Sequence, residues 1–400
     1  MVELRVAVPL PVGSAHEAAV AEVLVASLMH GYPGLDHSGI ADRLERSGST
    51  LDVGRTRWLM LAGSCPAGAL GDLADLIGSL LAGAGHSEDA VQYERRRAQQ
   101  KVGLAGAQPQ TVAAAALVQH AFGDVPALAP LPSVSDIGRV TAGDVRALHS
   151  RVIRPAGAYV VVVGDIDPDA AAVTVARATA GWESGPAVAP PAPPRPLPAG
   201  SLRLVDRPGA VQSQIRLLAP GIHRDDPRFP ALSMTNVVFG GYFSSRLVMS
   251  LREELGLAYR VDSSFRDYLD QVVIAVEADT ATEATAAALA QIRDQMRQLV
   301  QRPVTGRELD AARHYMAGMS VLVTASQGGL AGSLLSSLVL SRDPMRMVTF
   351  PSLLEGLSVD ELQQAAAEFY RPEAFCGVVV GDRSALTDDL KGIVDDVVVA

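Results

Sequence analysis

An internal repeat constrains the fold of this chain more than any other feature of its sequence. Arg154-Pro155 precede the run Val161-Val-Val-Gly164-Asp165, and Arg371-Pro372 precede the run Val378-Val-Val-Gly381-Asp382. The matching positions are 217 residues apart in every case. A repeated run of valines indicates a buried strand, and Gly-Asp indicates a turn after it. The chain is therefore expected to contain two copies of one structural unit.

The residues before each repeated strand support this interpretation. Thr141-Ala-Gly-Asp144 and Ser358-Val-Asp-Glu361 also match at an offset of 217. Each places a hydroxyl side chain three residues before an acid, which is the capping-box pattern of a helix start. Earlier elements correspond in order as well, as judged from apolar periodicity. In the first half we predict helices over 20–28, 40–46 and 70–80 and strands near 50–53 and 57–61; in the second half, helices over 229–238, 244–255 (ended by Gly256) and 289–299 and strands over 258–265 and 272–277.

A proline-rich segment separates the two copies. Residues 186–200 contain seven prolines, which fix φ, remove amide donors and favour a semi-extended connector. We therefore expect an N-terminal domain over 1–185, a linker over 186–200 and a C-terminal domain over 201–400. The pattern predicts an α+β fold in which each domain is an antiparallel sheet backed by helices. The apolar segment Leu330–Leu340 is either an internal helix or part of a partner contact.

Composition excludes several classes of function. Apolar residues make up 48% and charged residues 20%, which is typical of a globular chain, and no apolar run reaches the ~18 residues of a membrane helix. The start, Met1–Pro9, alternates like a strand and does not look like a secretion signal, so we expect a cytoplasmic location and no membrane partner. The net charge of −10 disfavours nucleic acid as a partner. Cys65 and Cys376 are interpreted as buried, inert thiols.

Three stretches of the second half form a long and specific motif. They are Val205-Asp-Arg-Pro-Gly-Ala-Val-Gln212, Ala219-Pro-Gly221 and Phe239-Gly-Gly-Tyr-Phe-Ser-Ser-Arg-Leu-Val-Met-Ser-Leu-Arg-Glu-Glu-Leu-Gly-Leu-Ala-Tyr259. This motif resembles the pitrilysin/insulinase zinc peptidases, and most closely the branch of the mitochondrial processing peptidase and its bacterial relatives. The resemblance covers nearly the whole chain and implies one half of a clamshell around a closed peptide chamber.

The resemblance also implies a zinc motif, which this chain lacks. Active members carry His-x-x-Glu-His on the first helix and a glutamate about 77 residues after the second histidine. One register places the three motif positions at Glu22, Val25 and Ala26 and the distal ligand at Gly103. Another register, aligned from Gly13-Ser14, places the motif at Ala26, Met29 and His30. Neither leaves a zinc site, since alanine has no donor atom and neither valine nor methionine accepts a proton.

The other residues of the sequence do not restore a metal or nucleophile site. The eight histidines include no pair three to five positions apart, and there is no Gly-x-Ser-x-Gly sequence. His30 is interpreted as an ordinary residue at a helix end. An independent zinc peptidase that uses His30 is kept as a further hypothesis.

Arg252 and Tyr259 match the arginine–tyrosine pair that the family extends from one half to the zinc site of the opposite half. A guanidinium can hold a substrate carbonyl or carboxylate, and a phenol can donate a hydrogen bond to the oxyanion of peptide hydrolysis. Gly256 is expected to end the helix between them, so that both side chains face one cavity. The structural alternative is a solvated arginine near a helix end and a tyrosine packed between helix and strand. Likewise, Gly240 and Gly241 either line a chamber wall or permit tight packing.

The resemblance therefore predicts a non-catalytic subunit of a heterodimeric zinc metallopeptidase. It would donate Arg252 and Tyr259 to a homologous zinc-carrying partner, hold no cofactor itself and act on a peptide substrate. The alternative is a scaffold or peptide-binding protein of the same fold with no catalytic role.

Overall fold

The computed structural model describes residues 1–400 except 187–188, 190–191, 387, 392–395 and 400. The chain forms two compact units, which are described separately. Unit 1 contains residues 1–105, 131–191 and 320–345, and unit 2 contains 106–130, 192–319 and 346–400. Four positions of the proline-rich linker, 187–188 and 190–191, lie outside the described residues.

Unit 1 is built on a four-stranded sheet with the order β4-β5-β1-β6, in which all pairs are antiparallel. A short hairpin of β2 and β3 follows the first helix. Its elements are β1 (Val2–Pro9), α1 (Ala15–Ser27), β2 (Gly31–Tyr32), β3 (Leu35–Asp36), α2 (His37–Ser47), β4 (Thr50–Arg55), β5 (Trp58–Cys65), α3 (Leu70–Gly83), α4 (Glu88–Gly106), α6 (Val134–Gly138), α7 (Ala142–Val152), β6 (Tyr159–Gly164), α8 (Pro168–Ala178) and α13 (Gln327–Val339).

Both faces of the unit 1 sheet are covered, because side chains of a strand alternate between its two faces. Leu4 and Val6 of β1 point toward α3 and α8, where they line a small apolar gap with Ile77 and Val175. Ala7 packs in a separate buried cluster with Ala331 and Leu335 of α13, among others. Helices therefore pack on both faces of β1, although on the α13 side Glu3, Arg5 and Pro9 stay partly exposed.

Unit 2 is built on a six-stranded sheet with the order β12-β7-β11-β8-β10-β9. The pairs β11–β8, β8–β10 and β10–β9 are antiparallel, whereas β7 pairs in parallel with both β11 and β12. Its elements are α5 (Pro109–Phe122), β7 (Leu202–Asp206), β8 (Gln212–Pro220), α9 (Phe229–Asn236), α10 (Arg246–Val248), β9 (Ala258–Tyr268), β10 (Gln271–Ala281), α11 (Thr285–Gln301), α12 (Gly306–Thr324, in unit 1 from Ser320), α14 (Arg346–Glu355), α15 (Val359–Phe369), β11 (Cys376–Gly381), α16 (Arg383–Leu386) and β12 (Asp396–Val399).

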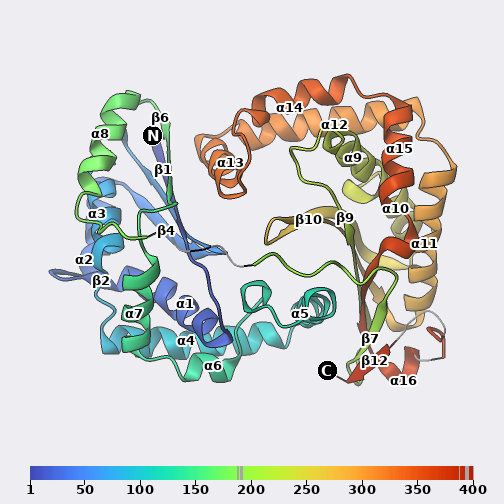
Figure 1. Ribbon diagram of the computed structural model, residues 1–400, viewed down its shortest axis with the longest axis horizontal. Coiled ribbons are helices and arrows are strands. Elements are labelled where there is room, and N and C mark those ends of the chain that lie inside the picture. Colours follow the sequence, from blue (N-terminus) through green and yellow to red (C-terminus); the bar gives the residue numbers. More distant parts are fainter. Residues whose placement is uncertain (187–188, 190–191, 387, 392–395, 400) are drawn as a thin grey trace. The chain divides into compact units, whose positions relative to one another are not determined.

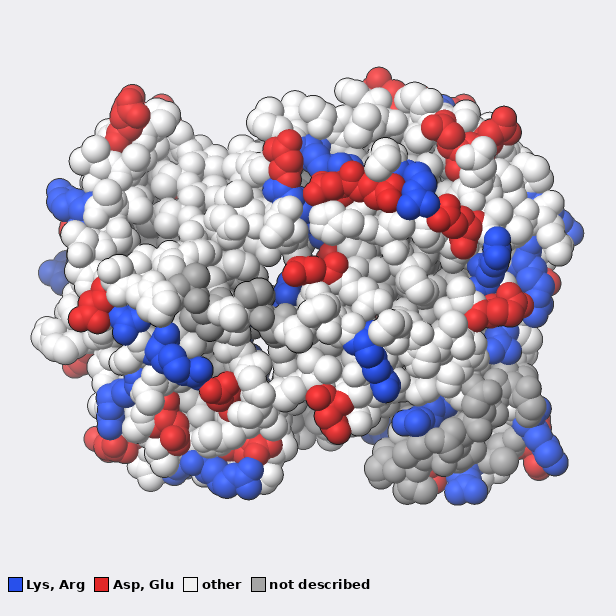
Figure 2. Space-filling view, in the orientation of Figure 1, with Lys and Arg blue, Asp and Glu red and all other residues white. Residues whose placement is uncertain are grey.

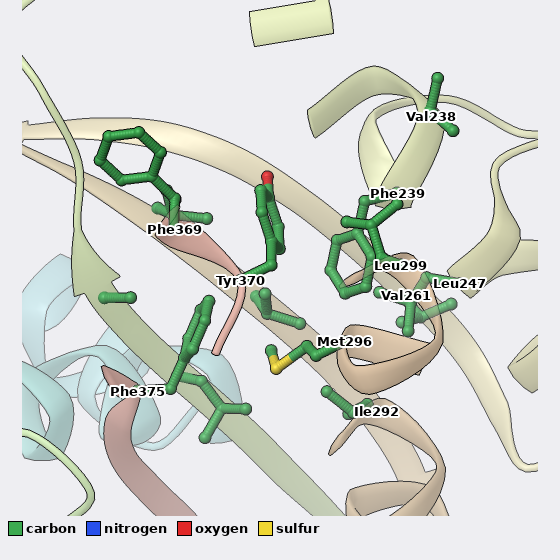
Figure 3. Packing of buried hydrophobic residues seen from close by; sticks show 14 of the residues in the cluster. Val238, Phe239, Leu247, Val261, Ile292, Met296, Leu299, Phe369, Tyr370 and Phe375 are labelled. Atoms are coloured by element: carbon green, nitrogen blue, oxygen red, sulfur yellow. The ribbon is translucent and has the colours of Figure 1, made fainter. Parts of the chain in front are cut away.

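The main core of unit 2 lies between its sheet and the helices α9, α11 and α15. Figure 3 shows Phe239 and Tyr370 in this core, beside Met296 and Leu299 of α11, and the two rings have centroids 4.8 Å apart. Tyr370 is fully buried, and its hydroxyl donates a hydrogen bond of 2.8 Å to Oδ1 of Asn236. The opposite face of the sheet packs against α5 through Leu218, among others.

The compact units exchange helices between the two halves of the sequence (Figure 1). Helix α5 belongs to the first half of the sequence but packs against β8 and β11 of unit 2. Helix α13 belongs to the second half but packs against β1 and β6 of unit 1. The segment Leu330–Leu340 therefore forms most of an internal helix. The linker divides the chain into the two repeated halves of the sequence. Each compact unit, however, takes segments from both halves.

The repeated ends of the two halves form the predicted elements. Both capping boxes are present. The Thr141 side chain accepts from the backbone N–H of Asp144, and the Asp144 carboxylate accepts from the backbone N–H of Thr141. Ser358 and Glu361 make the same two bonds. Each capped helix leads into a strand, β6 or β11, which carries the repeated valines. The α+β fold with sheets backed by helices is confirmed. The structure adds two parallel pairings in unit 2 and makes β5 longer than predicted.

An arginine, half-buried at position 5 and buried at position 216, is repeated in the two sheets at an offset of 211. The same offset relates Pro9 and Pro220 at the ends of β1 and β8. Nη1 of Arg5 donates to the carbonyl of Gly63 (2.8 Å), one residue after its register partner on β5. Nη1 of Arg216 donates to the carbonyl of Ala278 (3.0 Å), again one residue after its register partner. This shared geometry is a structural trace of the repeat that the sequence analysis missed.

Helix lengths and the charges visible on one face can be compared with the expectations from the sequence. In the described residues, no single helix combines the length and apolar character that crossing a bilayer requires. On the face shown in Figure 2, basic and acidic side chains are interspersed rather than gathered into one basic stripe. This distribution agrees with the net charge of −10.

Replacing Arg216 by alanine is expected to destabilise the protein by about 3–5 kcal/mol, because Asp279 would lose its buried partner. The Arg216 side chain is 3% exposed, and its Nη2 lies 2.7 Å from Oδ1 of Asp279. Urea unfolding followed by circular dichroism measures the change. Arg297→Ala, at an exposed position of α11, is the control and should stay within about 0.5 kcal/mol of the wild type. A loss below about 1 kcal/mol for Arg216→Ala would contradict the assigned role.

Candidate functional site

Arg252 and Tyr259 flank the end of a helical segment in unit 2. Arg252 lies on a π-helical turn over Met249–Glu254, and Tyr259 is the second residue of β9. Between them, Gly256 adopts a φ of +60°, a left-handed conformation that glycine tolerates best. The predicted helix end at Gly256 is therefore confirmed.

The segment that carries Arg252 is anchored on both sides. Leu247 and Leu251 are fully buried, and the amide of Leu257 donates to the carbonyl of Leu251 (2.8 Å). At the start of the segment, the Arg246 guanidinium bonds both carboxylate oxygens of Glu308 (2.6 and 2.9 Å). Burial alone would raise the pKa of Glu308, but its bonds with Arg246 and Thr305 outweigh burial and lower the pKa to about 2. The backbone around Arg252 is thus held in place without using Arg252.

Both candidate side chains are presented to solvent. Tyr259 is 88% exposed, and no hydrogen bond from the described part of the chain engages its hydroxyl. The Arg252 side chain is 54% exposed, and its one ion pair in the described residues is with the adjacent, equally exposed Glu253 at 3.5 Å. Arg260 on the same strand as Tyr259 instead pairs with Asp262 and Glu277 at about 3 Å. The fold therefore engages the neighbouring arginine and leaves Arg252 and Tyr259 available.

The sequence analysis missed the π-helical geometry beside this pair. We predicted one helix over 244–255, whereas α10 spans only Arg246–Val248 and continues as the π-helical turn. A second π-helical turn covers Val237–Gly241. Such turns are rare and occur frequently at functional sites. Gly240 lies in this second turn. A Cβ at position 240 would lie 2.8 Å from Cβ of Ser263, so the tight packing of the turn against β9 requires glycine.

The positions of the missing zinc motif do not fit a metal ion. Val25 is buried and Ala26 has no donor atom, while Gly103 on α4 has no side chain. Glu22 has both carboxylate oxygens engaged, by Nε of Arg55 (3.2 Å) and Nζ of Lys101 (3.3 Å). Among the described residues, no group of three or more His, Cys, Asp or Glu side chains is placed to hold a metal.

His30 is engaged by a carboxylate within unit 1. Its Nε2 lies 2.8 Å from Oε1 of Glu94, whose side chain is only 5% exposed. The His30 ring also stacks on His37, with centroids 5.3 Å apart. These contacts give His30 a structural role at the end of the first helix, as the sequence analysis interpreted it.

A buried chain of hydrogen bonds links three polar residues that the sequence did not single out. Ser27 Oγ lies 2.8 Å from Nδ1 of His86, His86 Nε2 lies 2.9 Å from Nδ1 of His149, and His149 Nε2 lies 3.1 Å from the Leu81 carbonyl. The Leu81 carbonyl can only accept, so Nε2–H of His149 must donate to it. With neutral rings, His86 then donates from Nε2 to His149, and the Ser27 hydroxyl donates to Nδ1 of His86. These residues are distant in sequence, so no local pattern indicates their contact. Ser27 is 0% exposed, which excludes it as a nucleophile for an external substrate.

Burial keeps both rings of this chain neutral. Desolvation, followed by the nearby His149, Arg146 and His30, lowers the pKa of His86 to about 3. The pKa of His149 is lowered as well, again mainly by desolvation, although its bond to Leu81 opposes the shift. The two cysteines are also buried and free, as predicted; desolvation raises the pKa of both thiols, to about 11 for Cys376.

The depressed pKa of His86 predicts a loss of stability in acid. An unfolded histidine takes up a proton near pH 6.5, whereas His86 in the folded chain does so only near pH 3. The contribution of His86 to the free energy of unfolding is therefore fully present above pH 6.5. It is lost as the pH falls from 6.5 to 3, by up to about 1.4 kcal/mol per pH unit. Urea unfolding from pH 7.5 to 4.5 should show a shallower acid slope for His86→Gln than for the wild type. His223→Gln, a surface histidine, is the matched control; equal slopes for wild type and His86→Gln would refute the assignment.

Comparison with known proteins finds one family model and several relatives that match part of the chain. Residues 139–316 match the family model described as "Peptidase M16 inactive domain". An uncharacterized zinc protease of Streptomyces coelicolor is 24% identical over 303 residues, which cover 74% of this chain and 65% of the relative, just under two thirds of its length.

Solved structures show the same fold. A peptidase M16 inactive domain from Pseudomonas fluorescens superposes with a TM-score of 0.86 at 23% identity, covering 95% of this chain and 93% of the other. A protease from Helicobacter pylori gives a TM-score of 0.83 at 18% identity, with the same coverage of both chains. These matches agree with the resemblance to the M16, pitrilysin/insulinase-type peptidases that the sequence motif indicates, and they show that the chain has the fold of the peptidase M16 inactive domain.

Proposed function

We propose that this chain is the non-catalytic subunit of a heterodimeric zinc metallopeptidase. It would enclose a peptide-degrading or peptide-processing chamber together with a homologous zinc-carrying partner. Arg252 and Tyr259 would be donated to the active site of that partner. The substrate would be a peptide, and this chain would hold no cofactor of its own.

The observation that carries the proposal is the contrast between the two candidate positions. In unit 1, the carboxylate of Glu22 pairs with Arg55 and Lys101, and within the part of the chain that the structure describes no metal ligand set accompanies it. In unit 2, Tyr259 is 88% exposed on an anchored segment, and Arg252 has only an exposed neighbour as a partner. An exposed phenol and guanidinium on a fixed backbone are suited to act on a molecule outside this chain.

The chemistry of the two side chains supports complementary roles. The Arg252 guanidinium can bind a substrate carbonyl or carboxylate through two parallel N–H donors, which sets the orientation of the peptide. The Tyr259 hydroxyl can donate a hydrogen bond to the oxygen that becomes negative when the peptide bond is attacked. The zinc expected on the partner would activate the attacking water. Neither side chain could perform hydrolysis without that partner.

Removing either donor is expected to slow peptide cleavage without preventing assembly. The tagged chain would be purified from its source cells together with the zinc-containing chain that accompanies it, and cleavage of fluorogenic peptides would be measured. Arg252→Ala and Tyr259→Phe should each lower kcat/KM by about 10- to 1000-fold, the range for loss of one transition-state donor. Binding of the partner, measured by gel filtration, should stay unchanged because a single exposed side chain is altered.

Matched substitutions separate this role from general effects. Arg307→Ala, at an exposed arginine of unit 2, and Tyr93→Phe, at a tyrosine that is 53% exposed in unit 1, should cleave at the wild-type rate. Wild-type rates for both Arg252→Ala and Tyr259→Phe in an active complex would refute the donation. A stable complex without any peptidase activity would favour the scaffold alternative.

A further inference from the structure

A polar cavity of about 290 Å³ lies in unit 1 beside the buried hydrogen-bond chain of Ser27 and the two histidines. It opens between the end of α3, one face of α7 and the residues that follow α8. Among the side chains that line it are those of His86, Arg146, His149, Arg154, Trp182 and Glu183. Two arginines and one carboxylate thus share a small space, and the proposed function uses none of them.

Arg154 belongs to the repeated Arg-Pro pair, but its copy in the second half of the sequence has a different role. Nε of Arg371 donates to the carbonyl of Ala367 (2.8 Å) in the last turn of α15, an ordinary contact for an arginine near a helix end. In the part of the chain that the structure describes, the Arg154 side chain makes no such bond to α7; its Nη1 lies 3.1 Å from Oε2 of Glu183 instead. The repeated arginine therefore serves the helix end in unit 2 and lines a cavity in unit 1.

The ion pair of Arg154 leaves most of its guanidinium free for another anion. Glu183 accepts from Nη1 alone, through its carboxylate at 3.1 Å and its carbonyl at 3.5 Å, and no hydrogen bond from the described residues engages Nε or Nη2 of Arg154. The Arg154 side chain is 22% exposed, whereas that of Glu183 is 79% exposed. An ion pair with one partner in solvent contributes little. An oxyanion that accepts two parallel N–H bonds from the guanidinium would bind more strongly.

The charges around the cavity favour an anion as its ligand. Arg146 is held at the cavity edge by the carbonyl of His86, which accepts from its Nη1 (3.0 Å), and its ion partner Glu88 is 79% exposed. Burial is the main cause of the depressed pKa of both imidazoles, but Arg154 adds to the effect at His149 and Arg146 adds to it at His86. The rings stay neutral, so the two guanidinium groups give this wall its positive charge.

We propose that this cavity binds a small oxyanion, a phosphate or a carboxylate, on the guanidinium of Arg154. The carboxylate of Glu183 holds the place that the ligand would take and competes with it. Trp182 is 7% exposed and its Nε1 donates to the carbonyl of Ile153 (2.8 Å), so its ring is a fixed wall of the cavity. The inference concerns unit 1 alone and is independent of the proposed function.

Trp182 provides a direct readout of binding, because it lines the cavity and the chain has only one other tryptophan, Trp58. In the W58F form of the full chain, the fluorescence of Trp182 is titrated with sodium phosphate and, separately, with sodium acetate. Sodium chloride at matched ionic strength controls for general salt effects. The titrations are repeated with R154Q and with E183Q in the same background, and far-ultraviolet circular dichroism verifies that each form is folded.

At least one of the two anions should change the fluorescence saturably, and the anion that binds more tightly identifies the ligand class. R154Q should weaken binding by at least about tenfold, because the two parallel donors are lost. E183Q should strengthen it by about three- to tenfold, because the competing carboxylate is removed. R96Q and E45Q make the same charge changes at exposed positions of α4 and α2 and should bind like the W58F parent.

Three results would overturn the proposal. Chloride could produce the same change as both anions, or neither anion could bind the folded E183Q form. The third is that R154Q binds as tightly as its parent, or that R96Q weakens binding as much as R154Q, since attraction would then be general and not tied to this cavity. E183Q alters an exposed side chain, so its titration remains decisive if R154Q does not fold.

Discussion

In each sheet, one face packs on helices of its own half of the sequence, and a helix that the other half supplies packs on the second face. Along β1, Val6 points to α3 while Ala7 points to α13; along β8, Leu217 and Leu218 belong to different clusters. An apolar sheet face must be buried against another layer. Since α13 and α5 are supplied crosswise, neither sequence half contains a complete core. The duplicated halves therefore depend on each other for folding, even though their strands and capped helices repeat.

The two halves share side-chain bonds to backbone carbonyls of a neighbouring strand. They differ in the side chains that hold the end of their first helix. Arg5 and Arg216 make the same bond to a carbonyl of the neighbouring strand. By contrast, the last residue of the first helix of each sequence half, α1 or α9, differs between the units. In unit 1 it is Ser27, bonded to a histidine pair; in unit 2 it is Asn236, which donates to the carbonyl of Ser263 and accepts from the Tyr370 hydroxyl. Both solutions hold the end of a buried helix, but with unrelated partners.

Local sequence patterns predicted most of the fold, because capping boxes, apolar periods and the glycine at 256 act over a few residues. The exchanged helices could not be predicted, since an apolar helix such as α13 carries no signal of which sheet it covers. The same limit applies to the candidate site. The family motif located Arg252 and Tyr259, and residue types alone showed that Val25 and Ala26 cannot bind zinc. The pairing of Glu22 with Lys101, 79 positions away, depends on how α1 and α4 pack and has no local signature.

Helix α1 of unit 1 and the Arg252–Tyr259 segment of unit 2 present their polar groups in opposite ways. Unit 1 turns them inward: Ser27 is fully buried and Glu22 is held between two cations, so the helix is stabilised but has little left to offer a ligand. In unit 2, the segment from Arg246 to Tyr259 buries Leu247 and Leu251 and leaves Arg252 and Tyr259 in solvent. Because the backbone that carries them is anchored, binding needs to order only the two side chains and not the segment itself. This exposure on a fixed backbone is the physical basis of the proposal that the two side chains act on a molecule outside this chain.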